Sequence, residues 1–157
     1  MTAKSKPFHL LLVSVGLILL LSSAPLFAQS NSVIDSVLSQ KQASFEDSVY
    51  LILAAGNLIP SSGSVKDALE TLKQKAWLDI PDRPDAPITF GQFAFLLMKT
   101  FNIPGGVLYS LFPGPRYAGR EVDYRGWTPA NLSPYEGLSG RDALYILRSF
   151  LDSRGGA

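Results

Sequence analysis

The chain has 157 residues, of which 46% are hydrophobic, and it carries a formal net charge of +1 and no cysteine. This length is sufficient for one domain with a packed core, and the absence of cysteine excludes a fold held together by disulfides. The near balance of charges gives no support for a nucleic-acid or anionic-membrane partner.

The first 28 residues have the order of features found in a secretory signal peptide. Lys4 and Lys6 precede an apolar run over residues 10–21, and small residues follow up to Ala28. Because this run is short for a bilayer span, we predict residues 1–28 to be a cleaved signal peptide. The protein is then exported to the periplasm or the cell surface, without membrane insertion. An uncleaved N-terminal anchor is the alternative.

Cleavage after Ala28 changes the chemistry that the chain can perform. It removes the only histidine, His9, and leaves 12 basic and 13 acidic residues. A chain without His and Cys lacks the usual ligands of zinc and copper, the commonest general base and the thiol nucleophile. We therefore predict no metal, no cofactor and no catalytic residue.

Residues 29–43 form a polar segment with few apolar positions. Those positions are at helical spacing, so we predict a flexible leader with at most a short, weakly held helix. Residues 44–152 are predicted to form the folded domain, and residues 153–157 a disordered tail. The apolar residues of the leader are Val33, Ile34, Val37 and Leu38.

Each apolar periodic run of the domain is preceded by a hydroxyl residue with an acid or amide three positions later. Such a pair supplies acceptors for the free N–H groups of a first helical turn. We therefore predict an all-α fold, with helices that end near Gly56, Ala76, Phe101 and Leu151. The four pairs are Ser44 with Asp47, Ser64 with Asp67, Thr89 with Gln92, and Ser139 with Asp142.

Two kinds of segment separate these helices. Residues 79–87 contain three prolines and, like residues 128–137, are predicted to form an ordered loop. Residues 104–117 are predicted to form one or two helical turns packed over the core. The apolar residues of those turns are Val107, Leu108, Leu111 and Phe112.

The domain contains an internal repeat. Residues 68–100 recur as residues 118–150 without a gap, and residues 45–58 match residues 90–103. Such a repeat predicts helical units that bury their apolar faces against one another. We predict three capped and two connecting helices in a pseudo-threefold bundle. The helix that begins at Phe45 then closes onto the C-terminal unit or onto another subunit.

Each unit reads as a helix ending at an aromatic residue, a loop with Asp and Pro, and a Thr or Ser box that opens a second helix. The residues are Lys75-Ala-Trp77 and Arg125-Gly-Trp127 at the helix ends, with Thr89-Phe-Gly-Gln92 and Ser139-Gly-Arg-Asp142 as boxes. This pattern resembles the S-layer homology (SLH) repeat over about residues 44–152. The resemblance implies tandem helix-loop-helix units in a cell-envelope protein.

The resemblance also implies a ligand. In SLH repeats an Arg of the box helps to bind pyruvylated cell-wall polysaccharide. This sequence has Phe90 and Gly140 at the corresponding positions, and Arg141 lies one place later. We therefore expect the scaffold to be shared and the polymer site to be lost or altered.

The segment 116–127 is the best candidate for a binding surface. Arg116, Arg120 and Tyr124 fall near one helix face, and arginines beside aromatic residues suit an acidic sugar or a partner's carboxylates. Alternatively, the aromatic residues belong to the core and the charges form ordinary surface ion pairs. The candidate binding residues are Arg116, Tyr117, Arg120, Tyr124, Arg125, Trp127 and Arg141.

The two tryptophans occupy equivalent places in the repeat. Trp77 and Trp127 are either platforms for stacking sugars or packing residues, and their equivalence favours packing. Thr89 and Ser139 are predicted to be structural helix caps.

Acidic residues of the loops are the remaining source of chemistry. They form either a carboxylate pair for glycan cleavage, a calcium site, or a solvated loop surface, and their spacing favours the last. The residues are Asp79, Asp82, Asp85 and Glu136.

Together these patterns predict a non-catalytic envelope protein that engages another envelope protein or assembly. Cell-wall polysaccharide binding or anchoring is the first alternative, and a carboxylate-based glycan hydrolase is the second. A monomer and an oligomer are both compatible with the sequence.

Overall fold

The computed structural model describes residues 28–60 and 62–155, which form seven helices and no strand. The prediction of an all-α chain is confirmed. The predicted signal peptide lies outside the described residues, apart from Ala28. The helices are α2 (Ala28–Ser39), α3 (Phe45–Ala55), α4 (Val65–Lys75), α5 (Phe90–Thr100), α6 (Val107–Leu111), α7 (Pro115–Tyr124) and α8 (Gly140–Gly155).

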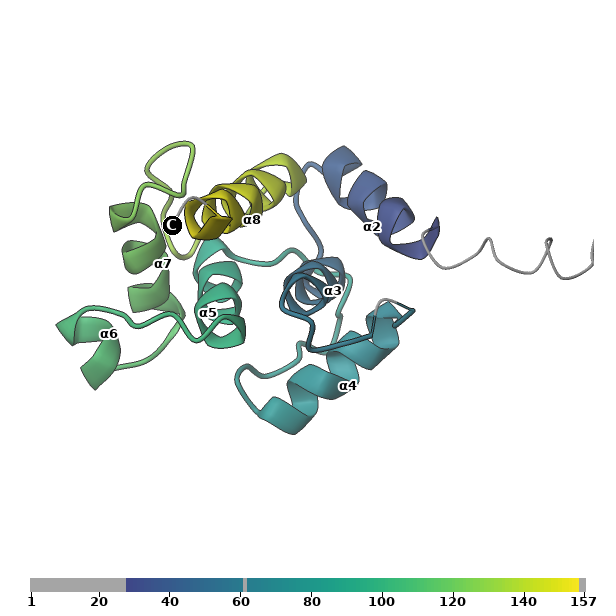
Figure 1. Ribbon diagram of the computed structural model, residues 1–157, viewed down its shortest axis with the longest axis horizontal. Coiled ribbons are helices and arrows are strands. Elements are labelled where there is room, and N and C mark those ends of the chain that lie inside the picture. Colours follow the sequence, from purple (N-terminus) through teal and green to yellow (C-terminus); the bar gives the residue numbers. More distant parts are fainter. Residues whose placement is uncertain (1–27, 61, 156–157) are drawn as a thin grey trace, which may run out of the picture.

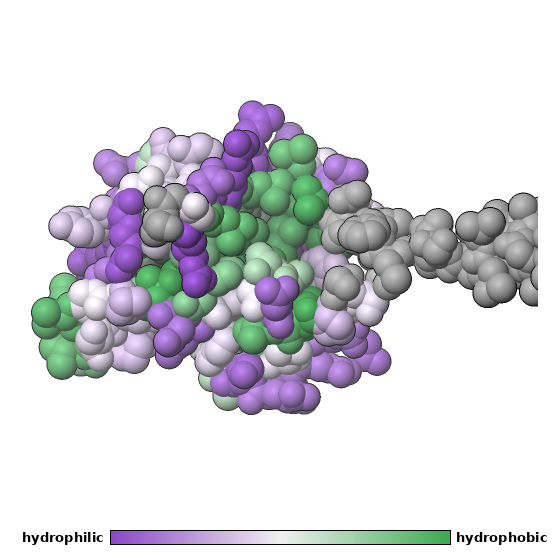
Figure 2. All heavy atoms as spheres, viewed as in Figure 1, coloured by the Kyte–Doolittle hydropathy of each residue, from purple (hydrophilic) through white to green (hydrophobic). Residues whose placement is uncertain are grey.

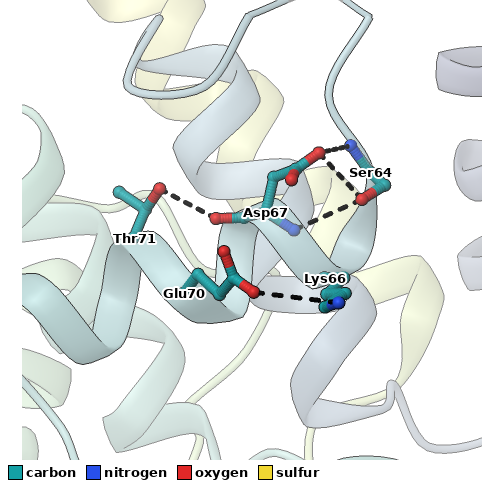
Figure 3. A network of polar contacts seen from close by, with 5 residues as sticks. All are labelled: Ser64, Lys66, Asp67, Glu70 and Thr71. Carbon is teal, nitrogen blue, oxygen red and sulfur yellow. Dashed lines mark hydrogen bonds and ion pairs between the residues drawn. The ribbon is translucent and has the colours of Figure 1, made fainter.

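The four hydroxyl residues predicted to open helices all do so. At α4, the Ser64 Oγ accepts the Asp67 N–H at 3.3 Å, and an Asp67 carboxylate oxygen accepts the Ser64 N–H at 2.7 Å (Figure 3). The hydrogen bonds that the Ser64 N–H and the Ser64 hydroxyl donate to this carboxylate lower the pKa of Asp67. Thr89 and Gln92 form the same reciprocal box at α5. Local side-chain acceptors therefore set where these helices begin.

The core lies between α3, α5 and the helices packed around them. Helix α5 packs against α7 and α3, α3 packs against α4, and α2 packs against α8. Helices α6 and α2 lie at opposite ends of the view in Figure 1. The largest fully buried side chains include Phe45, Phe90, Phe93, Phe150, Ile52, Leu53, Leu96 and Leu97.

Three buried residues just before the capped helices are joined by backbone hydrogen bonds in a closed cycle. The Ile88 N–H donates to the Ala43 carbonyl at 2.9 Å, and the Leu138 N–H donates to the Ile88 carbonyl at 3.0 Å. The Ala43 N–H donates to the Leu138 carbonyl at 2.7 Å and completes the cycle. All three residues are at most 1% exposed, so these donors and acceptors are satisfied away from water.

A second set of hydrogen bonds ties the first residue of each capped helix to a loop from another part of the chain. The N–H groups of Phe45 and Phe90 donate to the carbonyls of Ala86 and Glu136, at 2.8 and 2.9 Å. The Gly140 N–H donates to the Gln40 carbonyl at 3.2 Å. Gln40 therefore has the same role for α8 as the proline-rich loops have for α3 and α5.

The N-terminal segment differs from the flexible leader that was predicted. Residues 28–39 form α2, which packs on α8, and Val37 is completely buried. Gly140 explains this contact, because a Cβ on that residue would overlap the carbonyl oxygen of Val37. The structure thus has a third helix of the connecting type, where two were predicted.

Two further expectations are corrected. Ser153, Arg154 and Gly155 belong to α8 instead of a disordered tail, whose last two residues lie outside the described part of the chain. Helix α6 exists within residues 104–117, but of its residues only Tyr109 is buried. Its other apolar side chains point to solvent, so the predicted packing over the core is wrong.

Helices α4 and α7 end with the same backbone turn but with different residues. Ala76 has φ 50° and Gly126 has φ 72°. A left-handed backbone conformation is unfavourable for a residue with a side chain, but glycine adopts it without this penalty. We expect Ala76→Gly to raise the free energy of unfolding by about 0.5–1 kcal/mol.

The measurement is urea denaturation of the Ala76→Gly and Gly126→Ala variants and of the unmodified chain. Gly126→Ala should lower stability by a similar amount, since no atom lies within 4 Å of the added Cβ and only backbone strain changes. Destabilisation by Ala76→Gly would contradict the account.

Candidate binding surface

The segment that leads into α6 is held by side chains of α7. Glu121 Oε1 accepts the Gly106 N–H at 2.8 Å, and Arg125 Nη2 donates to the Pro104 carbonyl at 2.5 Å. A Cβ on Gly106 would lie 2.7 Å from that carboxylate oxygen, so a side chain here would make the Glu121 carboxylate shift. Two charged side chains thereby fix the path of the chain before α6.

Tyr109 anchors α6 from below. It is 8% exposed, and its ring lies 6.3 Å from the ring of Phe95. A Cβ on Gly105 would overlap the Tyr109 ring, so this glycine permits the close approach. Burial, together with the nearby charge of Glu121, raises the pKa of Tyr109, which keeps the phenol neutral at physiological pH.

The outward side of α6 is an exposed apolar patch. Val107 is 75% exposed, Leu111 65% and Phe112 62%, which is unusual for neighbouring large apolar residues in a chain with a well-filled core. Figure 2 shows this apolar end of the molecule where Figure 1 places α6. We call Val107, Leu108, Leu111 and Phe112 the α6 patch.

Basic side chains lie beside aromatic residues at the edge of the α6 patch. The Lys99 Nζ lies 5.4 Å from the centre of the Phe95 ring, next to Tyr109. The Arg116 guanidinium lies 5.7 Å from the ring of Tyr117, which is itself 6.3 Å from the ring of Phe112. The patch therefore has positive charge at its border.

A groove of about 470 Å³ lies at Pro104, in the segment that leads into α6. Its aromatic floor consists of Phe101, Trp127 and Phe150: the Phe101 and Phe150 rings are 4.5 Å apart, and Trp127 meets Phe150 edge-on at 5.1 Å. The lining residues are Phe101, Asn102, Ile103, Pro104, Arg125, Trp127, Phe150, Ser153 and Arg154.

Two guanidinium groups flank this aromatic floor. The Arg125 guanidinium lies 5.4 Å from the Trp127 ring, and the Arg154 guanidinium lies 5.5 Å from the Phe101 ring and 5.7 Å from the Phe150 ring. The Glu121 Oε2 atom lies 4.0 Å from the Arg125 Nε atom. Within residues 28–60 and 62–155, no acidic side chain forms an ion pair with Arg154.

The structure distributes the predicted binding residues over several places. Arg125 and Trp127 line the groove, whereas Arg116 and Tyr117 lie beside the α6 patch. Arg120 and Tyr124 are exposed on α7, with Tyr124 90% exposed. Arg141 lies apart from these, in a separate hollow of about 380 Å³ with Lys41 and Asp142.

Sequence reasoning missed half of the groove. Phe101 and Phe150 read as the ends of core helices, and Arg154 was assigned to a disordered tail. The available signal was the pair of aromatic residues at the C-terminal ends of two capped helices, one of which, Phe150, lies four positions before Arg154.

Trp77 and Trp127 have partly similar surroundings. Both are half-buried against the core, and each lies near a cation two residues before it: Lys75 Nζ is 5.8 Å from the Trp77 ring. Trp127 also contacts the ring of Phe150.

The acidic residues of the loops are exposed. Asp85 lies 3.2 Å from Arg83, and this hydrogen-bonded pair lowers the pKa of Asp85. In the described part of the chain, no three His, Cys, Asp or Glu residues are grouped closely enough to hold a metal ion. The exposed acids are Asp79, Asp82, Asp85 and Glu136.

The two positions at which the SLH resemblance places a ligand-binding Arg hold buried residues. Phe90 is 1% exposed and packs in the core, and Gly140 faces the backbone of α2.

Among the described helices, none combines the length and the apolar character needed to cross a bilayer. No protein-family model, curated protein or solved structure matches the chain.

Proposed function

We propose that this chain is a non-catalytic, exported envelope protein built from three SLH-like units around a pseudo-threefold axis. In this proposal it binds another envelope protein through the α6 patch. The partner presents an apolar surface bordered by acidic residues. The observation that carries the proposal is that α6 is rigidly tethered and yet exposes its apolar side chains.

The cyclic hydrogen bonds support the three-unit arrangement. Ala43, Ile88 and Leu138 each donate to one member of the set and accept from the other. Each connecting helix also packs on the capped helix of another unit: α4 on α3, α7 on α5, and α2 on α8. In this arrangement α2 closes the ring, so α3 needs no second subunit to complete its packing.

The tethers of α6 support a protein-binding role over an incidental exposed loop. A disordered apolar loop would lose conformational entropy on binding, whereas α6 is already held by Glu121, Arg125 and Tyr109. Lys99 and Arg116 add positive charge at the edge, which favours a partner with carboxylates at the rim of its binding surface. The patch therefore has the apolar centre and polar rim of a protein interface.

Polysaccharide binding is less well supported. The two positions that would carry the Arg of the SLH box hold Phe90 and Gly140, both buried, and Arg141 lies in a different hollow. The loop acids of the hydrolase alternative are exposed, and no buried carboxylate pair accompanies them in residues 28–60 and 62–155.

The test is the double substitution Leu111→Ser/Phe112→Ser. Both side chains are exposed, so we expect the free energy of unfolding to change by less than about 0.5 kcal/mol. Loss of two interfacial apolar anchors should weaken partner binding at least about 10-fold. The measurement is affinity capture from an envelope extract with the mature chain as bait, followed by a binding titration with the captured protein after purification.

The matched control is Tyr135→Ser, which removes an exposed aromatic residue outside the α6 patch. The control should capture the same protein as the unmodified chain. Equal capture by the double variant would overturn the proposal. So would a sedimentation experiment in which the unmodified chain forms a stable dimer that the double substitution dissociates, because a second copy would then occupy the patch.

A further inference from the structure

The aromatic groove has no counterpart at the equivalent place in the preceding unit. There, Gly56 and Thr100 stand in place of Phe101 and Phe150, and a Cβ on Gly56 would overlap the Thr100 side chain. A glycine and a threonine in close contact thus replace two phenyl rings at the same junction. The fold can be built without the aromatic floor, which points to a role for this floor other than packing of the scaffold.

One of the two cations of the groove, Arg154, is also specific to it. The position that matches Arg154 at the repeat offset is Pro104, which has no charge. Arg125 and Arg154 both line the groove; Glu121 pairs with Arg125 at 4.0 Å, whereas no acidic side chain of the described residues forms an ion pair with Arg154. The groove therefore has an excess of positive charge on an apolar floor. Guanidinium groups bind carboxylates in a bidentate manner.

We propose that this groove binds an acidic peptide segment, with a carboxylate between Arg125 and Arg154 and an adjacent apolar side chain on the aromatic floor. The inference rests on the proposed function, because the segment is assigned to the partner that covers the α6 patch. The two sites are connected: Pro104 lines the groove, receives a hydrogen bond from Arg125, and leads directly into α6. A partner chain that leaves the α6 patch can continue into the groove.

The polar inventory of the groove favours a peptide over a sugar chain. Apart from the two arginines, its lining has only two polar side chains, Asn102 and Ser153. The Ser153 hydroxyl already donates to the Phe150 carbonyl at 2.6 Å. The lining therefore offers few hydrogen-bond partners for the hydroxyl groups of a sugar residue. A carboxylate next to an aromatic or aliphatic side chain meets both features of the groove.

The test uses the mature chain and a phage-displayed library of random 12-residue peptides. We expect enrichment of peptides with Asp or Glu beside an apolar residue. A synthetic peptide of the enriched sequence is then titrated by calorimetry in 50 mM and 300 mM NaCl. Arg154→Gln should weaken its binding at least about 10-fold and reduce the salt dependence, because one charge-assisted pair is lost.

The matched control is Arg148→Gln on the same helix, where Arg148 pairs with Asp152 at 3.5 Å. This variant should bind the peptide like the unmodified chain. A Trp77→Phe variant leaves Trp127 as the fluorescent reporter of the groove, and its emission should change on binding. An unaltered emission, or equal affinity of the Arg154→Gln variant, would overturn the inference.

Two further arms separate the possible failures. The Leu111→Ser/Phe112→Ser variant should retain peptide binding. If this variant also captures the partner as well as the unmodified chain does, only the docking role of the α6 patch is refuted. An oligomer of glucuronic acid is titrated in parallel. Stronger and Arg154-dependent binding of this sugar would assign the groove to an acidic glycan and overturn the peptide assignment.

Discussion

Replacing Gly140 with alanine should detach α2 from α8 and lower the free energy of unfolding by about 3 kcal/mol. The added Cβ would overlap the carbonyl oxygen of Val37 and would lie 2.7 Å from its carbonyl carbon and 3.2 Å from the carbonyl oxygen of Gln40. These are backbone atoms, so they cannot move without displacing the whole segment. Loss of this contact exposes Val37 and breaks the hydrogen bond from Gly140 to Gln40.

The measurement for Gly140→Ala is hydrogen exchange combined with urea denaturation. Amides of residues 32–39 and the Ala43 amide should lose protection, while those of α5 keep theirs. Gly155→Ala is the control, because this glycine lies in the same helix with no atom within 4 Å of an added Cβ. It should leave stability unchanged or slightly higher. Retained protection over residues 32–39 in the Gly140→Ala variant would show that α2 does not depend on this contact.

The same glycine explains why the third connecting helix could not be predicted from the sequence. The repeat was recognised by matching apolar positions and caps, and these signals are local: Ser64 and Thr89 bond to residues only three positions away. Among residues 32–39 of α2, Val37 is the only fully buried side chain, and its close contact uses a glycine more than 100 residues later. The apolar spacing of residues 33–38 indicates a short helix, but a contact made by the absence of a side chain cannot be seen in that pattern.

The groove was hidden for a related reason. Arg125 and Trp127 were recognised because they lie close together in the sequence. Phe101 and Arg154 are separated by a loop, α6, α7 and α8, so only the packing of those elements brings them to one surface. The exposure of α6 was equally unpredictable, since an apolar pattern between turn-forming residues indicates a short helix without indicating whether anything covers it.

The second large effect is expected at Gly91, at the first turn of α5. A Cβ there would lie 2.7 Å from the Pro134 carbonyl oxygen and 2.8 Å from that of Pro115. Both neighbours are backbone, one in the loop before α8 and the other at the start of α7. We expect Gly91→Ala to lower the free energy of unfolding by about 2–3 kcal/mol, because α7 and the loop must move apart.

The control for Gly91→Ala is the equivalent residue of the preceding capped helix. Glu46 donates its N–H to the Pro84 carbonyl, as Gly91 does to Pro134, yet it carries a side chain. Burial, with the charges of Asp47 and Asp85, raises the pKa of Glu46, so the fold favours its protonated form. Its charge therefore adds no stability at neutral pH, and Glu46→Ala should change the free energy of unfolding by less than about 0.5 kcal/mol.

The Gly91→Ala variant also links the scaffold to the binding surface. Glu121 lies on α7 and bonds to Gly106, and Arg125 directly follows the last residue of α7 and bonds to Pro104. Displacement of α7 therefore loosens both tethers of α6. Urea denaturation measures the loss of stability. Hydrogen exchange of the Gly106 amide in the native state separately measures the loosening of the segment before α6. If Gly91→Ala leaves both unchanged, α7 is not held against α5 through this glycine, and the rigidity on which the α6 interface depends must come from elsewhere.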